Sequence, residues 1–287
     1  MEATLTRHRF RAMGTDVELI VEADGAARSL AAAEAEFHRL EALLTRFRPE
    51  SQLSRLNATS SIVAGPDLLR VVELALAARE RTGGRFDITI HDALLAAGYD
   101  RSFELLSPDD ARPAERVPGA RGRVEIADGV ISLHGGARID LGGIGKGYAC
   151  ERAAEILATA GPCLVNAGGD IATRDGVWTV AVETPDGPLA LELSGSCALA
   201  TSGRDSRRWR RAGRELHHII DPATGEPSSR DLLRVTVVAR DDVDAEVTAK
   251  ALFLAGSEAA RREAEELAIP AVLVTESGRT ITAGGLA

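Results

Sequence analysis

Hydrophobic residues near the amino terminus alternate with polar ones. Val17, Leu19 and Val21 follow a period of two, and the alternation begins at residue 9, so we expect paired strands over residues 9–23. Residues 13–15 interrupt the alternation and mark the turn. From residue 26 to residue 47 the period becomes helical, and one face of this long predicted helix carries Leu30, Ala33, Phe37, Leu40 and Leu44.

Polar residues dominate the stretch that follows this helix. We interpret residues 48–60 as a loop. A second helix is predicted over residues 66–81, because Pro66 and Asp67 occupy helix-start positions and a Gly-Gly pair follows its end.

The segment after the second helix mixes apolar and acidic residues. We expect Phe86, Ile88 and Ile90 to face one way and Asp87 to be presented from the other side. Residues 99–120 are rich in Pro, Asp and Arg and lack a clear period, which indicates a surface excursion that carries no chemistry.

The second half of the chain is predicted to be mostly strands, with two helices near the end. A hairpin is expected over residues 124–133, with Asp128-Gly129 at its turn. Polar loops at residues 198–209 and 215–227 flank another pair of strands. In residues 163–173, a buried strand is expected to run into Gly168-Gly169-Asp170. Further strands are expected over residues 177–183, 188–193 and 232–240, helices over 243–255 and 258–267, and two short strands after them. Because no repeat or flexible linker divides the chain, we expect one mixed α+β domain over residues 1–287.

Composition narrows the classes of function. With 45% hydrophobic residues the chain can bury a large core, while its net charge of −9 argues against nucleic-acid binding, which depends on a basic surface. Cys150, Cys163 and Cys197 are widely spaced and odd in number, which favours structural thiols over disulfides or a zinc site. No apolar run reaches the roughly 18 residues of a membrane span, so we expect a cytoplasmic protein without membrane contact.

The stretch of residues 137–157 has the layout of an anion-binding element. A short apolar strand is predicted to end at Asp140, a loop with four glycines follows, and a helix begins near Lys146. Glycines let a backbone approach a ligand closely, and the free N–H groups of a first helical turn favour phosphate. The spacing matches neither the P-loop nor the dinucleotide-binding glycine pattern.

Six segments, taken together and in order, resemble the ApbE family of FAD:protein FMN transferases. They are RFRPESQLSRLN at 46–57, GRFDITI at 84–90, IDLGGIGKGYACERAAEIL at 139–157, LVNAGGDI at 164–171, ATSG at 200–203 and HIIDPATG at 218–225. The resemblance implies an α+β, T-fold-like architecture of mixed sheets with packed helices. It also implies that FAD is bound with Mg²⁺, that a threonine or serine hydroxyl of an acceptor protein attacks the FAD pyrophosphate, and that AMP leaves.

The same resemblance implies roles for individual residues of this chain. Met13 and Phe47 would pack on the flavin, and Phe47 replaces the tyrosine that is frequent there. The backbone carbonyl of Gly143 would face the metal, and His218 with Ile219 would line the active site. The remaining residues expected at the FAD are Arg85, Phe86, Asp87, Asp140, Lys146, Thr201, Ser202 and Gly203. His218 is the candidate general base, because an imidazole with a pKa near about 6.5 suits proton transfer.

A basic run lies beside the ATSG segment. It consists of Arg204, Arg207, Arg208, Arg210, Arg211 and Arg214. Two interpretations remain open, a solvated hairpin tip, or an attractive surface for FAD phosphates or an acidic acceptor protein.

The last expected motif departs from the family. Where the family has an Asp and a Thr four residues apart as metal ligands, this chain has Glu246 and Lys250. An ammonium would repel a cation, and the two residues also form a favourable ion pair at helical spacing. Lys250 either replaces the metal and neutralises the pyrophosphate directly, or marks a flavin-binding protein without transferase activity. A two-residue slip that brings Asp244 and Thr248 to the metal is a third possibility, and hydrolysis of FAD to FMN and AMP is an alternative reaction.

Overall fold

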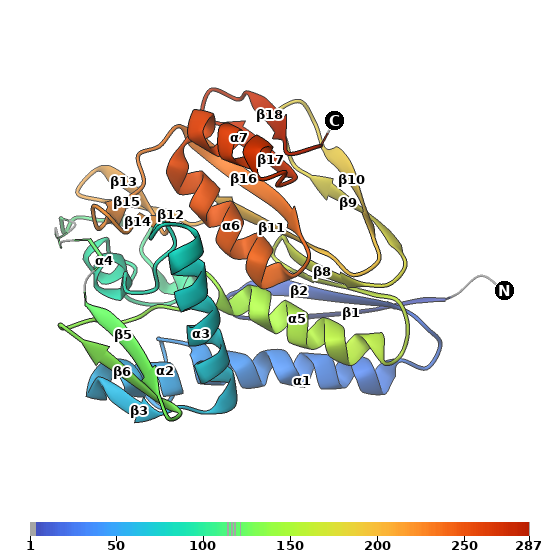
Figure 1. Cartoon of the computed structure of the whole chain (residues 1–287), viewed down its shortest axis with the longest axis horizontal. Helices are drawn as coiled ribbons and strands as arrows, with labels where there is room; N and C mark the ends of the chain where they lie inside the picture. The colour runs from blue at the N-terminus through green and yellow to red at the C-terminus, as the bar shows by residue number, and fades with distance from the viewer. Residues whose placement is uncertain (1–3, 114, 116, 118, 121, 287) are drawn as a thin grey trace. The chain divides into compact units, whose positions relative to one another are not determined.

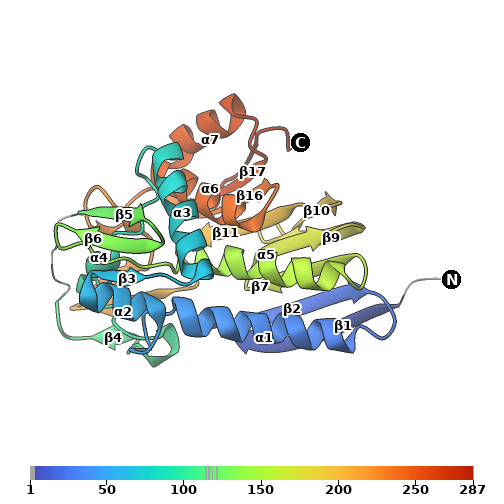
Figure 2. The same cartoon turned by 60° about the horizontal axis from the view of Figure 1, so that its bottom comes forward.

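The computed structural model describes residues 4–113, 115, 117, 119–120 and 122–286. The chain packs as two compact units, and each is assembled from separated segments. The first unit contains Met1–Glu41, Ile144–Ser202 and Asp231–Ala287, and the second contains Ala42–Gly143 and Gly203–Arg230. Figures 1 and 2 show the elements of both units along the chain.

An eight-stranded sheet organises the first unit. Its strands lie in the order β1, β2, β7, β8, β11, β16, β17, β18, so the amino-terminal hairpin and the carboxyl-terminal strands form its two edges. Their bounds are β1 Leu5–Ala12, β2 Thr15–Glu22, β7 Cys163–Ala167, β8 Asp170–Arg174, β11 Ala198–Gly203, β16 Leu232–Ala239, β17 Ala271–Thr275 and β18 Thr280–Ala283.

Helices pack on one face of this sheet and a hairpin on the other. α5 (Gly145–Ala158) contacts β7 and β8, and α6 (Asp242–Ala255) lies beside α5 and against β16 (Figure 1). α7 (Ser257–Glu266) follows α6 and contacts β17 and β18. The opposite face is covered by the hairpin of β9 (Val177–Val182) and β10 (Leu189–Ser194), whose Trp178 and Leu193 share a core with Leu164 and Ile171 of the sheet. Because side chains alternate between the two faces of a strand, the sheet contributes apolar residues both to the core under the helices and to the core under the hairpin.

The second unit contains short helices and three small sheets. Its strands are β3 (Ser61–Val63), β5 (Arg123–Ala127) and β6 (Val130–His134), then β4 (Asp109–Asp110), β12 (Arg208–Arg211) and β13 (Arg214–His217), then β14 (Ile220–Asp221) and β15 (Glu226–Pro227). The helices are α2 (Gln52–Thr59), α3 (Pro66–Arg81) and α4 (His91–Ala96), with a 3-10 turn η1 at Phe103–Leu105. α1 (Ala27–Leu44) carries the chain from the first unit into the second.

Most predicted elements are confirmed. The long first helix, the second helix, both late helices, the amino-terminal strand pair, the 124–133 hairpin and the strands predicted over 177–183 and 188–193 lie where the sequence pattern placed them. The pair expected between the loops at 198–209 and 215–227 is the β12–β13 hairpin, whose strands extend into both predicted loops. At the predicted turn of the β5–β6 hairpin, Asp128 and Gly129 have φ of 50° and 75°, the left-handed pair that a two-residue hairpin turn needs. The described residues between 100 and 113 are half-buried or exposed, as expected of a surface segment.

The predicted loop at residues 48–60 is wrong, because it contains α2. The Ser51 hydroxyl accepts a hydrogen bond from the Ser54 N–H at 2.9 Å and caps the helix, while Leu53 and Leu56 are buried. Two apolar residues in an eight-residue helix are too few for a clear period, so the capping serine was the informative signal.

Two further predictions are wrong in detail. Residues 137–140 do not form a strand, because the backbone of Ile139 pairs with a side chain. The Asn57 amide N–H donates to the Ile139 carbonyl, and the Asn57 amide oxygen accepts from the Ile139 N–H, at 2.8 Å each. Residues 198–203, expected as part of a polar loop, form the sheet strand β11, in which Ala198, Leu199 and Ala200 are buried.

Candidate active site

Two lysines and two carboxylates meet where α5 and α6 pack in the first unit. Lys146, at the start of α5, forms a very close ion pair with Asp170 at the start of β8. The Lys146 Nζ also lies 3.5 Å from Oε1 of Glu246 on α6, and the Lys250 Nζ lies 3.9 Å from the same oxygen. The carboxylates are deeply buried, with side chains 2% (Asp170) and 5% (Glu246) exposed. The predicted residues Lys146, Glu246 and Lys250 are therefore brought together.

The second oxygen of Glu246 caps the amino terminus of α5. Its Oε2 accepts a hydrogen bond from the Gly147 N–H at 3.0 Å. A Cβ on Gly147 would lie 2.8 Å from the Asp242 carbonyl oxygen, so glycine is what lets the two helices approach. One N–H of the first helical turn is thus bonded to a carboxylate of the protein, and phosphate binding at this helix start stays a prediction. The same contact shows that α6 has the unshifted register, with Glu246 rather than Asp244 turned toward α5.

Burial shifts the pKa values of groups beside the cluster. Burial raises the pKa of the Asp242 carboxyl well above its usual range, and the nearby Glu246 charge adds to the effect. Burial likewise raises the pKa of the Cys150 thiol, and it raises that of Cys163 to about 11. All three cysteines are free, so the prediction of unpaired structural thiols is confirmed.

The donor set at Glu246 does not fit a divalent cation. One carboxylate oxygen is bonded to a backbone N–H and the other faces two ammonium groups, whereas Mg²⁺ requires oxygen ligands around it. Like charges at such distances repel, so the lysines would oppose a cation placed beside them. Over the part of the chain that the structure describes, no group of three or more His, Cys, Asp or Glu residues could hold a metal.

In the second unit a buried arginine connects two aromatic rings to Asp140. The Arg46 guanidinium lies 4.3 Å from the ring centre of Phe47 and 4.7 Å from that of Tyr99, and its Nε lies 2.8 Å from Oδ2 of Asp140. Asp140 Oδ1 accepts the Gly142 N–H at 2.9 Å. The Arg46 side chain is only 5% exposed, while Phe47 is 38% exposed. The stack therefore orients a solvent-facing ring and an acidic side chain together.

The other predicted nucleotide contacts of this unit are mostly engaged within it. Asp87 accepts hydrogen bonds from Arg79 Nε at 2.6 Å and from the Thr89 N–H and hydroxyl at 2.8 Å each. Asp87 and Phe86 are both buried. Arg85 is half-buried, and its Nε donates to the Thr82 carbonyl at 3.2 Å. Their contact with the nucleotide stays a prediction.

The two adjacent histidines have different environments. The Nε2 of His217 lies 2.9 Å from the Ser228 carbonyl, and its Nδ1 accepts the Ile219 N–H at 3.2 Å. These partners require the neutral Nε2–H tautomer, and burial lowers the pKa of His217 in agreement. His218 is half-buried and Ile219 is buried. Of the pair, His217 is held by backbone groups, and the role of His218 as a base stays a prediction.

The remaining predicted residues occupy strand ends of the first unit and its boundary. Met13 sits in the β1–β2 turn with φ of 52°, and its N–H donates to Oε1 of Glu41 at 2.9 Å. With Gly14 at φ of 68°, it forms the left-handed pair that a two-residue hairpin turn needs, as Asp128 and Gly129 do. The Thr201 and Thr236 hydroxyls are 2.9 Å apart, and Ser202 is buried. Gly203 ends β11 and Gly143 lies in the turn before α5.

Four arginines of the basic run lie on the β12–β13 hairpin, and Arg204 and Arg207 precede it. Arg208 pairs with Glu215 at 3.7 Å and Arg214 with Glu226 at 3.0 Å. Because carboxylates of the same unit neutralise these arginines, the arrangement favours the solvated-hairpin interpretation.

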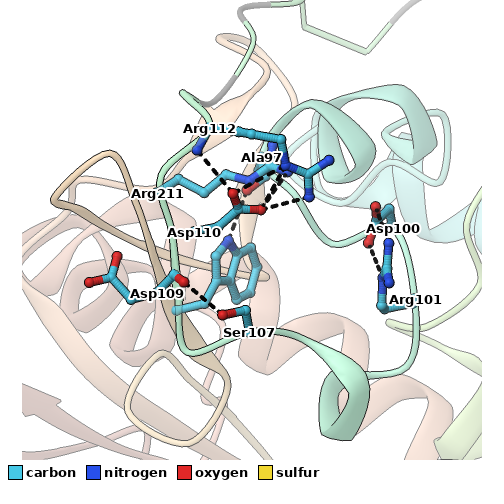
Figure 3. Close-up of polar contacts among 9 residues, drawn as sticks. Ala97, Asp100, Arg101, Ser107, Asp109, Asp110, Arg112 and Arg211 are labelled. Carbon is cyan, nitrogen blue, oxygen red and sulfur yellow. Dashed lines mark hydrogen bonds and ion pairs between the residues drawn. The ribbon is translucent and has the colours of Figure 1, made fainter.

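A small polar cavity of about 130 Å³ lies beside this hairpin in the same unit. Arg112 and Arg211 converge on Asp110 at 2.6 and 3.4 Å, and the Trp209 indole N–H donates to the Ala97 carbonyl at 2.8 Å (Figure 3). The Arg112 guanidinium holds the pKa of Asp110 well below its usual range. The charged side chains that line the cavity pair with one another, so they connect β4 to β12 and do not offer a ligand site.

Sequence reasoning missed three members of these clusters. Arg46 begins the RFRPESQLSRLN segment and directly precedes the expected aromatic Phe47, but it was assigned no role, and Tyr99 lies outside the quoted segments. Asp170 ends the quoted NAGGD segment but had no role as the partner of Lys146. An arginine beside an aromatic residue and an acidic residue at a strand start are weak signals by themselves, because their partners are distant in sequence.

Comparison with known proteins gives consistent results. The sequence model of the ApbE family matches residues 13–273. A Klebsiella pneumoniae protein named FAD:protein FMN transferase is 31% identical over 257 residues, covering 83% of this chain and 79% of that protein. A Treponema pallidum protein of the same name is 29% identical over 250 residues, covering 76% and 68%.

Solved structures share the fold. The ApbE protein of Thermotoga maritima superposes with a TM-score of 0.85 at 26% identity, covering 98% of this chain and 97% of that one. The apo form of the Pseudomonas stutzeri flavinyl transferase ApbE gives a TM-score of 0.84 at 22% identity, covering 99% and 96%. The predicted architecture of mixed sheets with packed helices is confirmed.

Proposed function

Because the chain belongs to the ApbE family, we propose that it is an FAD:protein FMN transferase that moves FMN from FAD to a threonine or serine hydroxyl of an acceptor protein. The observation that carries the proposal is 31% identity to a named transferase over 83% of the chain. Two observations support it. The lysine cluster of the first unit provides partly exposed ammonium groups suited to a phosphate, and the second unit provides the exposed Phe47 ring beside Arg46.

The proposed reaction exchanges one phosphorus–oxygen bond for another. The acceptor hydroxyl oxygen bonds to the phosphorus on the FMN side of the diphosphate, and the anhydride bond to the bridging oxygen breaks. AMP leaves with that oxygen and its electron pair, and the hydroxyl proton passes to a base. We assign the base to His218, because the neighbouring His217 is held by the Ser228 carbonyl and the Ile219 N–H.

The other predicted residues would bind and orient the donor. In this proposal Phe47 and Met13 contact the flavin, and Asp140, held by Arg46, contacts the FAD. Mg²⁺ is not assigned a role, because the groups around Glu246 do not fit it.

No helix among the described residues is long and apolar enough to cross a membrane. The cytoplasmic location expected from the sequence stays a prediction.

Mass spectrometry tests the proposal. Purified protein, FAD and a candidate acceptor domain should yield an acceptor heavier by one FMN moiety and one equivalent of AMP, while an acceptor with alanine at the modified threonine should gain nothing. AMP without a mass gain would indicate hydrolysis, and bound flavin without either product would indicate a binding protein.

The His218→Asn variant should lose at least about 100-fold in the rate of FMN transfer. His134→Asn, an exposed histidine of β6, should match the parent enzyme.

A further inference from the structure

The chain contains only two lysines, and both lie in the same cluster. The sequence has 34 Lys and Arg residues, of which only Lys146 and Lys250 are lysine. These two residues are about 100 positions apart on separate helices, yet both ammonium groups face Oε1 of Glu246, at 3.5 and 3.9 Å. The chain therefore uses arginine for its other basic side chains and lysine at one cluster.

Ammonium and guanidinium groups differ in ways that explain this choice. Lysine carries a compact charge at the tip of a flexible chain, as a metal ion is a compact charge, whereas arginine presents a planar fork. Two point charges can approach one carboxylate oxygen and still reach a further ligand oxygen. The cluster therefore resembles a cation site that is filled by the protein's own groups.

Exposure and charge balance indicate which groups a ligand would meet. The Lys146 and Lys250 side chains are 18% and 16% exposed, while Asp170 and Glu246 are 2% and 5% exposed. The carboxylates are thus covered and the ammonium groups partly reachable. The two lysines balance the two carboxylates they contact, so the cluster has no net charge, and an added dication would leave it with excess positive charge. A phosphate oxygen would meet the ammonium N–H donors, because these are the more exposed groups of the cluster.

We propose that Lys146 and Lys250 together supply the positive charge that a divalent metal ion would otherwise supply to a phosphate group of the bound nucleotide, so that this chain binds FAD and transfers FMN without a divalent cation. The inference rests on the proposed function, because it concerns the same donor nucleotide.

A binding measurement on the full chain tests this directly. FAD is titrated in excess EDTA and in excess magnesium chloride. The two dissociation constants should agree within about twofold. FAD binding that needs magnesium, with a loss of tenfold or more in EDTA, would overturn the proposal while leaving the transferase function intact. No FAD binding under either condition would contradict the transferase function and this inference together.

The scarcity of lysine allows a second readout on the unaltered sequence. Reductive methylation with ¹³C-formaldehyde keeps the positive charge and labels only Lys146, Lys250 and the terminal amine. Both lysine methyl signals should shift when FAD is added in EDTA, and FAD should slow their modification. Saturating FAD that leaves both signals unmoved would refute the contact between these lysines and the nucleotide.

A substitution separates charge replacement from a merely structural role. Lys250→Thr should weaken FAD binding in EDTA by about tenfold, and added magnesium should restore part of the loss because an oxygen ligand replaces an ammonium. Arg262→Met, which removes one positive charge from an exposed position of α7 in the same unit, should change neither value. A folded Lys250→Thr protein, checked by its thermal unfolding, with FAD affinity equal to the parent in EDTA would contradict the proposal.

Discussion

At the scale of single residues, Arg46 is the clearest case of a side chain whose role depends on its neighbours. Its guanidinium contacts two rings and the Asp140 carboxylate, and almost none of it is exposed. Removing one partner of a buried ion pair leaves the other charge without compensation, which is costly. The residue therefore couples the stability of the second unit to the orientation of Phe47 and Asp140.

Arg46→Met is expected to lower the free energy of unfolding by about 3 kcal/mol, because Asp140 loses its cation. It should also weaken FAD binding, because the Phe47 ring loses the group that stacks on it. Urea unfolding and FAD titration measure the two effects. Arg48→Met, two positions along on an exposed side chain, is the matched control and should behave as the parent. An Arg46→Met protein with parental stability would contradict the coupling.

His217 gives a pH dependence with a defined sign. Burial lowers its pKa in the folded chain, so the unfolded chain takes up the proton at higher pH. Its contribution to stability is complete above the unfolded pKa of about 6.5 and is lost as the pH falls through the folded pKa. The free energy of unfolding should therefore decrease below about pH 6.5.

Urea unfolding across pH 5 to 8 measures this decrease. The His217→Asn variant should show a smaller decrease on acidification, since it has no imidazole to protonate. The exposed His134→Asn variant should keep the parental pH dependence. Equal slopes in parent and His217→Asn would show that the histidine does not drive the effect. His91, whose pKa burial also lowers, would account for a slope that remains in the variant.

At the scale of elements, the contact between α5 and α6 depends on one glycine. A Cβ at position 147 would lie 2.8 Å from the Asp242 carbonyl oxygen and 2.9 Å from its carbon, so the helices would have to separate. Separation would also lengthen the bond from the Gly147 N–H to Glu246. The lysine cluster is therefore sensitive to the helix spacing.

Gly147→Ala is expected to cost about 1–3 kcal/mol of stability, as overpacking of a close contact does. Gly145, two residues earlier in α5, has no atom within 4 Å of an added Cβ, so Gly145→Ala is the matched control and should be neutral or slightly stabilising. Thermal unfolding of the two variants distinguishes them. Equal melting temperatures for the two variants would show that α6 moves away from residue 147 without a loss of stability.

Sequence patterns predicted elements well where the period was long. α1 and α6 have many apolar positions, whereas α2 has two buried leucines and was missed. The extended Ile139 segment pairs with the amide of Asn57 instead of a strand, and a side-chain partner 82 residues away leaves no local pattern. The first failure comes from the shortness of α2, and the second comes from a partner that is distant in sequence.

At the scale of the whole molecule, motif order predicted the fold and family but not the contacts of the site. The predicted residues divide between the two compact units, with Lys146, Glu246 and Lys250 in the first and Phe47, Asp140 and His218 in the second. The chain passes between the units near the segments that carry the motifs. One domain over residues 1–287 stays a prediction, since the compact units are discontinuous in sequence.

The edge strand β1 has a consequence for the behaviour of many copies in solution. Among the described residues, β1 pairs with β2 on one side, and its Arg7, Arg9 and Arg11 alternate as exposed positions. A second molecule that tried to extend the sheet there would bring its own arginines alongside these. Charged side chains on an open edge discourage such pairing, so the amino-terminal hairpin protects the sheet against growing into an aggregate.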